Sequence, residues 1–400
     1  MKALRNYINK IKPTFEEGGK LSMFRSVFDG FETFLFVSNK TSGSGVHIHD
    51  SIDSKRTMSA VIVALIPALL FGMYNTGYQH NLALDTDPGF WITFVYGFLA
   101  ILPKIIVSYV VGLGIEFVAA QWKKEEIQEG FLVSGMLIPM IVPIDTPLWM
   151  IAVATAFAVI FAKEVFGGTG YNVFNVALVT RAFLFFAYPA AMSGDQVFVR
   201  TDSTFGIGAG EIVDAFSGAT PLGQIGTAAK ETIGFFQTID VLGNPLTTWD
   251  YFWGLIPGSI GETSVPAILI GAAILLFTGV ASWKTMFSVF IGGAITAAVF
   301  NLVGTTVGMT ISPADHLFLG GFAFGAVFMA TDPVTSARTE TGKYIYGFLV
   351  GAFAIIIRVL NPGYPEGMML AILLMNTFAP LIDYYVVESN VKRRLKRAVK

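Results

Sequence analysis

Long apolar stretches recur along most of the chain and are separated by short polar connections. Eight of these stretches are long enough for a helix to cross a hydrocarbon layer of ~30 Å. They occupy residues 57–75, 91–119, 148–162, 172–190, 264–281, 286–304, 343–360 and 366–386. The pattern predicts an all-α integral membrane protein built from spanning helices.

Two further apolar stretches, 131–145 and 316–330, are short for a membrane span. At ~1.5 Å per residue, a helix of about 15 residues reaches only ~22 Å. We therefore expect each stretch to lie inside the bundle or to enter and leave the membrane by the same side. Together with the eight longer stretches they give about ten transmembrane segments.

The two short stretches also suggest an internal repeat. Residues 131–145 and 318–332 have the same length, contain glycine, end in an aspartate and are closely followed by proline. Further along, Gly170-Tyr171 opens the fifth segment and Gly363-Tyr364 opens the tenth. Because five is odd, two successive copies insert with opposite orientation, which predicts a 5+5 inverted repeat with two short or broken segments. Chance similarity between glycine-rich apolar segments is the alternative.

The distribution of Lys and Arg predicts the orientation. Nine basic residues precede the segment 57–75, and six follow the segment 366–386. Most other basic residues lie in alternate connections, whereas the opposite connections hold only Arg200 and Lys230. Since cytoplasmic connections are enriched in Lys and Arg, we expect both termini in the cytoplasm and the loop 191–263 outside. If the two short segments are re-entrant, this loop changes side.

Composition agrees with one membrane domain. Hydrophobic residues make up 54% of the chain and charged residues 14%, far from the balance of a soluble domain. We expect a cytoplasmic amino-terminal arm at 1–55, a transmembrane domain at 56–390 and a basic cytoplasmic tail at 391–400. The arm lacks the basic region and apolar core of a secretory signal, so it is expected to be retained.

Charge and cysteine content exclude several functions. The net charge of −2 and the scattered basic residues argue against a nucleic-acid partner. The chain has no cysteine, so it supplies no thiolate to an iron-sulfur cluster and forms no disulfide. The histidines match no standard ligand spacing, and we predict no metal site.

The polar loop contains a candidate attachment site, Ser217-Gly218-Ala219-Thr220. Small neighbours leave the Thr220 hydroxyl sterically open, and Gly218 lets a bulky partner approach the backbone. A phosphate could be esterified to this hydroxyl. A serine/threonine turn or a helix N-cap is the ordinary alternative.

Ionisable groups in hydrocarbon are costly and are tolerated mainly when they are paired or hydrated. Glu129, Asp332 and Asp383 fall at expected ends of segments, where they can supply oxygen ligands to Na⁺ or simply cap helices. Arg181 and Arg358 lie deeper in their segments. We expect structural pairing with acids for both arginines, although an anionic flavin or quinone headgroup is a second possible partner.

Amides and aromatic rings provide two further candidates. Asn172 and Asn175 enter a membrane segment directly after a glycine-rich stretch, where they can bind a flavin ring or the neighbouring backbone. Phe324 and Phe328 stand beside small glycines that let other helices approach closely. These rings can form a hydrophobic gate, or they can be ordinary packing residues.

Several motifs together resemble the B subunits of sodium-translocating NADH:quinone oxidoreductases and the related D subunits of Rnf complexes. The motifs are Asp-x-x-Ser-Gly-Ala-Thr at 214–220, Glu-Gly-Phe at 129–131, Ala-Lys-Glu-Val-Phe-Gly-Gly-Thr-Gly at 162–170, Phe-Met-Ala-Thr-Asp-Pro at 328–333, Asn-Pro-Gly-Tyr-Pro-Glu-Gly-Met-Met at 361–369 and Ala-Pro-Leu-Ile-Asp at 379–383. The length and the polar arm are more similar to the sodium-pump subunits. Ala215 departs from the glycine common at that position.

The resemblance implies two flavins. FMN would be joined through its phosphate to Thr220 within Ser217-Gly218-Ala219-Thr220, by a flavin transferase that works outside the cytoplasm. A noncovalent riboflavin would lie inside the membrane, which agrees with a flavin-binding role for Asn172 and Asn175.

The resemblance also implies an ion path and partners. It links Glu129, Asp332 and Asp383 to Na⁺ uptake, and it places Phe324 and Phe328 at a constriction of the path. Partners would be a subunit with NADH, FAD and iron-sulfur sites, a second FMN subunit and small membrane subunits, in a bacterial inner membrane.

The leading hypothesis is therefore a redox subunit that passes electrons from covalent FMN through a membrane flavin to ubiquinone and contributes to Na⁺ movement. NADH should bind elsewhere, because no nucleotide-binding pattern is present, and the isolated chain should be inert toward NADH. A secondary transporter of inverted-repeat architecture without flavin is the alternative. A scaffold without flavin or ion path fits the acids in the apolar segments poorly.

Overall fold

The computed structural model describes residues 2–16, 18–36, 45, 54–123, 130–193, 197–201, 218–233, 235–361, 363 and 366–398. Across these residues the secondary structure is helical, with one isolated bridge between Ile239 and Pro245 and no strand. This confirms the predicted all-α class.

Six helical segments are long and apolar enough to cross a membrane. They are α3 (Ser54–Ala83), α4 (Phe90–Lys123), α6 (Leu148–Ala158) with its continuation to Phe166, α12 (Trp283–Val303), α16 (Glu340–Leu360) and α17 (Met368–Ala398). The continuation of α6 is a π-helix, Val159–Lys163, followed by a 3₁₀ turn, Glu164–Phe166. The chain is therefore a multi-pass membrane protein.

The remaining apolar elements are short. They are α5 (Phe131–Ile141), α7 (Val176–Ala187), α11 (Val265–Phe277) and an interrupted run of α14 (Pro313–Phe318), α15 (Phe322–Phe324) and a π-helix (Gly325–Met329). The short or broken form predicted for 131–145 and 316–330 is confirmed. The expectation of full-length helices at 172–190 and 264–281 was wrong.

Local backbone chemistry explains both shorter helices. Before α7, Gly167, Gly168 and Gly170 have φ values of 114°, 95° and 93°, which a right-handed helix does not allow. The helix starts only after Asn175, whose side chain accepts hydrogen bonds from the first free N–H groups. After α11, Gly279 at φ 71° ends the apolar stretch early.

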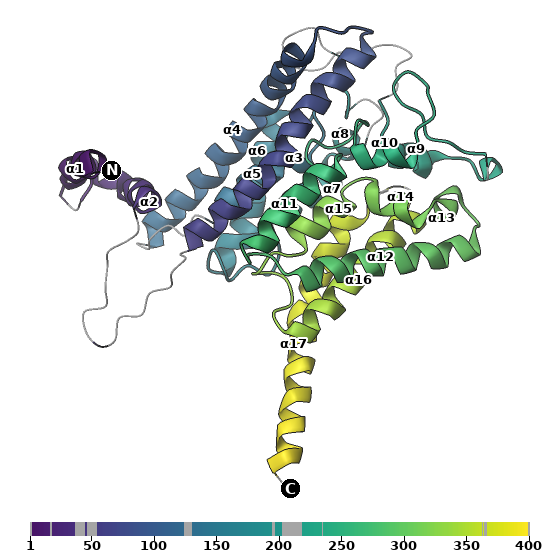
Figure 1. Cartoon of the computed structure of the whole chain (residues 1–400). Helices are drawn as coiled ribbons and strands as arrows, with labels where there is room; N and C mark the ends of the chain where they lie inside the picture. Colours follow the sequence, from purple (N-terminus) through teal and green to yellow (C-terminus); the bar gives the residue numbers. More distant parts are fainter. Residues whose placement is uncertain are drawn as a thin grey trace.

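Small helices gather at one end of the molecule. This loop end carries α8 (Pro189–Met192), α9 (Pro221–Thr227), α10 (Thr248–Trp253) and α13 (Val307–Thr310), and the opposite tail end carries the protruding part of α17 (Figure 1). The amino-terminal arm contains α1 (Lys2–Ile11) and α2 (Arg25–Leu35) and lies beside the tail end. Residues 391–398, expected as a separate tail, continue α17.

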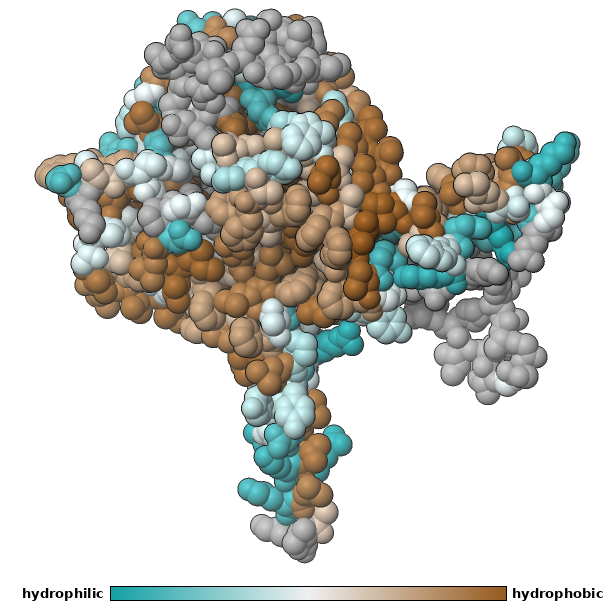
Figure 2. Space-filling model, turned by 180° about the vertical axis from the view of Figure 1, so that it is seen from behind, coloured by the Kyte–Doolittle hydropathy of each residue, from teal (hydrophilic) through white to brown (hydrophobic). Residues whose placement is uncertain are grey.

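Close helix packing holds the bundle together. The most extensive contact joins α12 to α16, where a Cβ added to Gly351 would lie 2.0 Å from the carbonyl oxygen of Val289. Small residues at such crossings let helix backbones approach, which is how membrane helices gain packing contacts. The outer surface of the bundle is largely apolar, whereas the protruding end of α17 is largely polar (Figure 2).

The short helix α5 and the broken 313–329 run lie where the predicted repeat requires short or broken segments. The helices that follow begin at Val176 and Met368, a few residues beyond the glycine-tyrosine pairs that were expected to open them. The 5+5 inverted repeat stays a prediction.

Substitution of Gly351 by alanine should lower the thermal stability of the purified protein. The new methyl group meets backbone atoms of α12 that cannot move aside, and such overpacking costs about 1–3 kcal/mol. Gly114→Ala is the matched control, because Gly114 also lies inside a helix and a Cβ there meets nothing within 4 Å. Equal melting temperatures for the two variants in detergent would contradict this packing argument.

Candidate functional site

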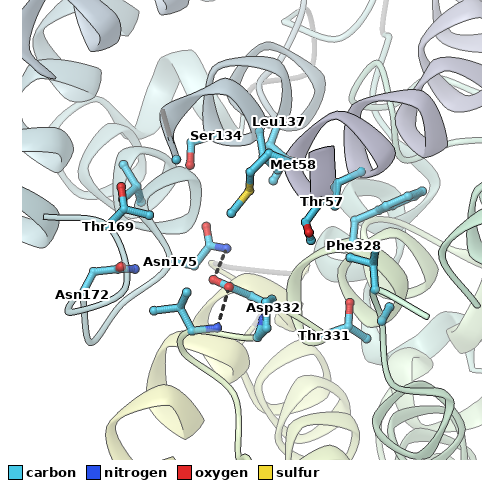
Figure 3. A pocket seen from close by; sticks show the side chains of 18 of the residues that line it. Thr57, Met58, Ser134, Leu137, Thr169, Asn172, Asn175, Phe328, Thr331 and Asp332 are labelled. Carbon is cyan, nitrogen blue, oxygen red and sulfur yellow. Dashed lines mark hydrogen bonds between the residues drawn. The ribbon is translucent and has the colours of Figure 1, made fainter. Parts of the chain in front are cut away.

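In the described part of the chain, cavities with polar side chains in their walls lie at both ends of the bundle core. The larger, here the Asn175 cavity, has a volume of about 90 Å³, which is room for several water molecules. It lies at the tail end, because it is lined by the first turns of α3 and α5 and by the residues that directly follow α11. Its polar lining side chains are Thr57, Ser134, Lys163, Thr169, Asn172, Asn175, Thr331 and Asp332 (Figure 3).

Asn175 connects two elements at this cavity. Its Oδ1 accepts from the backbone N–H groups of Ala177 and Leu178 at 3.0 and 3.3 Å, which caps α7. Its Nδ2 donates to Asp332 Oδ2 at 3.2 Å (Figure 3). The same amide therefore begins a helix and fixes the carboxylate of the cavity.

Asp332 is held from three directions. Besides Asn175, the backbone N–H of Val334 and the hydroxyl of Thr335 each donate to it at 3.0 Å. Two carboxylate oxygens can together accept more hydrogen bonds than these three. The carboxylate thus keeps acceptor capacity toward the cavity.

Other polar groups also face the Asn175 cavity. Lys163 is 4% exposed and forms an ion pair with Glu116 of α4. Thr169 Oγ1 is buried and makes no hydrogen bond within the described parts of the chain. Asn172 bonds only nearby backbone, through Phe174 O at 3.0 Å and Gly170 N at 3.3 Å. A ligand in this cavity would find an available hydroxyl, amides and a lysine that is ion-paired with Glu116.

The smaller cavity, here the Thr220 cavity, lies at the loop end. It has a volume of about 20 Å³, enough for one water molecule, and its lining includes Thr220, Ser259, Glu262 and Glu366. Thr220 is the N-cap of α9, and its Oγ1 accepts from the N–H of Gly223 at 3.1 Å. The hydroxyl proton remains available, since the cap uses the oxygen as an acceptor.

A buried ion cluster forms the inner wall of the Thr220 cavity. Arg181 of α7 lies 3.5 Å from Glu262 Oε1 and also forms an ion pair with Glu366. Arg181 and Glu262 are only 2% and 3% exposed. Burial raises the pKa of the Glu262 carboxyl, which belongs to the loop between α10 and α11, and the nearby Arg181 guanidinium opposes that shift.

Arg358, the second arginine, binds backbone rather than a carboxylate. Its guanidinium donates to the carbonyl oxygens of His316 at 2.5 Å, Leu319 at 3.1 Å and Glu366 at 3.3 Å. The predicted acid pairing therefore holds for Arg181. Arg358 instead satisfies the carbonyl groups that the interruption after α14 leaves without helical partners.

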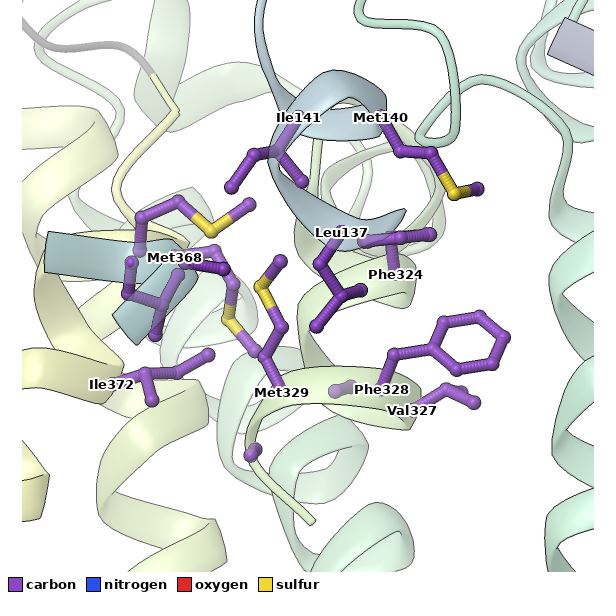
Figure 4. Close-up of a cluster of buried hydrophobic side chains, with 14 of the residues drawn as sticks. Leu137, Met140, Ile141, Phe324, Val327, Phe328, Met329, Met368 and Ile372 are labelled. Carbon is purple, nitrogen blue, oxygen red and sulfur yellow. The ribbon is translucent and has the colours of Figure 1, made fainter. Parts of the chain in front are cut away.

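A cluster of buried apolar side chains, here the apolar layer, lies in the core (Figure 4). We define it as Leu137, Met140, Ile141, Phe324, Val327, Phe328, Met329, Met368 and Ile372, none of which is more than 5% exposed. Leu137 and Phe328 line the Asn175 cavity. On the other side, a Cβ added to Gly261 would lie 3.0 Å from the ring of Phe324. The layer thus reaches the residue next to Glu262.

The structure groups the predicted site residues in three places. Asn172, Asn175, Asp332 and Phe328 share the Asn175 cavity. The ring centroids of Phe324 and Phe328 lie 4.9 Å apart within the apolar layer, with the ring planes tilted by 49°. The attachment candidates Gly218, Ala219 and Thr220 lie at the loop end, whereas Ser217 and Glu129 lie outside the described residues.

Asp383 lines neither cavity. Its two carboxylate oxygens accept from the backbone N–H groups of Arg338 and Thr339, at 2.7 and 3.0 Å, and from the Thr339 hydroxyl at 2.6 Å. These donors precede α16, so Asp383 ties the start of α16 to α17. This matches the capping alternative that the sequence left open.

Sequence reasoning missed the roles of Glu262, Glu366 and Lys163. Glu262 lies in a loop with no periodic pattern, and Glu366 lies in a glycine- and proline-rich connection. Their partners come from distant segments, and one sequence contains no signal for such pairing. For Lys163, its place at the end of an apolar stretch was the available signal.

These features define a class of protein: a multi-pass helical membrane protein whose interrupted helices hold polar cavities at both ends of its core. The chain belongs to the NQR2, RnfD, RnfE family, whose family model matches residues 41–392.

Similar curated proteins extend over nearly the whole chain. The B subunit of the Na(+)-translocating NADH-quinone reductase of Chromohalobacter salexigens is 42% identical, over 98% of this chain and 96% of its own. The corresponding B subunits of Ectopseudomonas mendocina and Yersinia pestis are 42% and 43% identical, over 99% and 98% of this chain and 100% and 99% of their own.

The capping role of Asp383 gives a stability prediction. Asp383→Asn should lower the melting temperature in detergent by an amount equivalent to about 1 kcal/mol, because the amide has one acceptor oxygen where three donors converge. Glu388→Gln on the same helix is the control, since its exposed pair with Lys392 contributes little. An unchanged melting temperature for Asp383→Asn would refute the capping role.

Proposed function

We propose that this chain is the membrane-embedded B subunit of a sodium-translocating NADH-quinone reductase. The observation that carries the proposal is the 42–43% identity to proteins of that name over almost the full length of both chains. In this function the chain passes electrons toward ubiquinone and contributes to Na⁺ movement, and NADH is oxidised on a partner subunit.

The tail end faces the cytoplasm and the loop end faces outward in this proposal. Lys163 lines the cavity at the tail end, and Lys123 pairs with Glu164 beside it. Lys284 and Lys343 both pair with Glu340. Such clustering of Lys on one side supports a cytoplasmic assignment for that side, in a bacterial inner membrane.

Thr220 is the proposed attachment residue for FMN. Its hydroxyl lies on a cavity wall, half-buried, and the small residues Gly218 and Ala219 precede it. A flavin transferase would act on it from outside the cytoplasm. The bound flavin would supply one-electron redox chemistry, and the α9 cap would fix the position of the ester oxygen.

The Asn175 cavity is the proposed place of the noncovalent riboflavin. The Thr169 hydroxyl and the Asn172 and Asn175 amides offer hydrogen bonds, and the Lys163–Glu116 ion pair lies beside them. Apolar walls such as Leu137 suit a ring system. These residues would orient the flavin and exclude bulk water from it.

The proposed Na⁺ path starts at the same cavity. Glu129 and Asp383 belong to its cytoplasmic side, and Asp332 supplies a carboxylate with free acceptor capacity at the cavity wall. Phe324 and Phe328 then close the way with two rings in tilted contact. The other proposed partners are the subunit with NADH, FAD and iron-sulfur sites, the second FMN subunit and the small membrane subunits.

Thr220→Ala should abolish covalent flavin. The chain is coexpressed with its flavin transferase and run on a denaturing gel under ultraviolet light, where the wild type should give a fluorescent band and Thr220→Ala none. Thr227→Ala is the matched control, because Thr227 lies on the same helix and bonds only helix carbonyls. Absence of fluorescence from the wild type would instead favour a transporter without flavin.

Asp332→Asn should weaken Na⁺ binding while keeping the shape of the cavity. Loss of the negative charge should raise, by about tenfold, the Na⁺ concentration at which the assembled complex oxidises NADH at half its maximal rate. A tenfold change corresponds to about 1.4 kcal/mol of Na⁺ binding free energy. Asp87→Asn, at an exposed turn, serves as control. An unchanged Na⁺ dependence for Asp332→Asn would remove this residue from the path.

A further inference from the structure

Three short elements each run from the Asn175 cavity to the immediate surroundings of Glu262, which lines the Thr220 cavity. The N-cap of helix α5, Gly130, lines the first cavity. Near the end of α5, Met140 O accepts from the N–H of Gly261, at 2.8 Å, next to Glu262. The 11 residues of α5 are about 16 Å long at ~1.5 Å per residue. The two cavities are therefore much closer together than the two faces of a bilayer.

Helix α7 makes the same connection with polar groups at both ends. Asn175 at its start binds Asp332, and Arg181 binds Glu262 and Glu366. Arg181 lies six positions after Asn175, so the two contacts are about 9 Å apart along the axis. The third element is the segment from Gly321 to Asp332. A Cβ added to Gly321 would lie 2.7 Å from Glu262 Oε1, so this segment begins beside Glu262.

An ion that passes the two phenylalanine rings meets Glu262 next. The Phe324 ring lies against Gly261, the neighbour of Glu262 in the chain, and Glu262 lines the Thr220 cavity. Two cations near one carboxylate repel each other, so Na⁺ and the Arg181 guanidinium compete for Glu262. While Arg181 holds both acids, this end of the core is closed.

Arg181 reaches its two acids with different nitrogens. A charge-assisted N–H···O bond normally measures about 2.7–2.9 Å, and the distance from Arg181 Nη1 to Glu262 Oε1 is longer, at 3.5 Å. Nη2 pairs with Glu366. Glu262 is thus held by a long contact, and Arg181 keeps a second partner in Glu366 when that contact opens.

We propose that Arg181 is a positioning residue that closes the Thr220 end of the Na⁺ path by holding Glu262 against Glu366, and that it releases Glu262 as each ion leaves. This rests on the proposed function and extends the path from Asp332 across the apolar layer to an exit beside the flavin attachment residue. Glu262 becomes the second carboxylate that the ion meets.

The test uses the assembled complex in proteoliposomes and the double variant Arg181→Gln/Glu262→Gln. Removing one positive and one negative charge together keeps the net charge of the ion cluster, and the Arg358 guanidinium remains beside Glu366. The number of Na⁺ ions taken up per NADH oxidised should fall, and passive ²²Na⁺ leak should rise about tenfold, which corresponds to about 1.4 kcal/mol lost from the closed state. The ratio of Na⁺ ions taken up to NADH molecules oxidised does not depend on the amount of active complex.

A second buried pair supplies the matched control. Arg200 and Asp145 lie 3.5 Å apart, are 5% and 19% exposed and line neither cavity. Arg200→Gln/Asp145→Asn should leave both the ratio and the leak at wild-type values. A leak of the same size in this control would show that any lost ion pair loosens the bundle and would overturn the specific role of Arg181.

A single variant covers the case in which the double variant does not assemble. Arg181→Lys keeps the charge, but one ammonium group lacks the fork that reaches two carboxylates, so the leak should still rise. If an assembled Arg181 variant keeps the wild-type ratio of Na⁺ to NADH and the wild-type Na⁺ leak, the proposal is overturned. If the wild-type complex itself moves no Na⁺, the proposed function fails, which separates that failure from a failure of the Arg181 role alone.

Discussion

Backbone hydrogen bonding in the membrane is the constraint on which this structure depends. Non-helical backbone is tolerated within a bilayer only where protein or a hydrated cavity surrounds it. The break around α15 therefore lies in the buried core of the bundle, whereas the break before α7 lies at the tail end and beside the Asn175 cavity. Side chains satisfy the freed groups: Asn175 caps α7, and Arg358 binds the carbonyl groups after α14.

The same breaks create the chemistry of the core. Each one brings polar side chains to a depth that a continuous apolar helix would not allow, with Asp332 at one cavity and Glu262 at the other. Between them only the apolar layer remains, and its centre is the contact of Phe324 with Phe328. In the proposed function, electron flow near Thr220 and ion movement through this layer take place within a short distance of each other.

The sequence predicts the membrane class and the short segments well because both follow from length and composition. It fails at 172–190, where hydropathy continues but the helix begins only after its N-cap, Asn175, and ends at Ala187. Thr220 and Asn175 were recognisable from local motifs. The pairing of Arg181 with Glu262 and Glu366 was not, because these residues are far apart in the chain and only the packing of α7 brings them together.

In the proposed function the two cavities open to opposite sides of one apolar layer, and their accessibility can be measured directly. Because the chain has no cysteine, single variants Ser134→Cys in the Asn175 cavity and Thr220→Cys in the Thr220 cavity can be labelled with a membrane-impermeant maleimide in intact and inverted vesicles. Each cysteine should react from one side only, and the two from opposite sides. Labelling of both cysteines from the same side would contradict the proposed path.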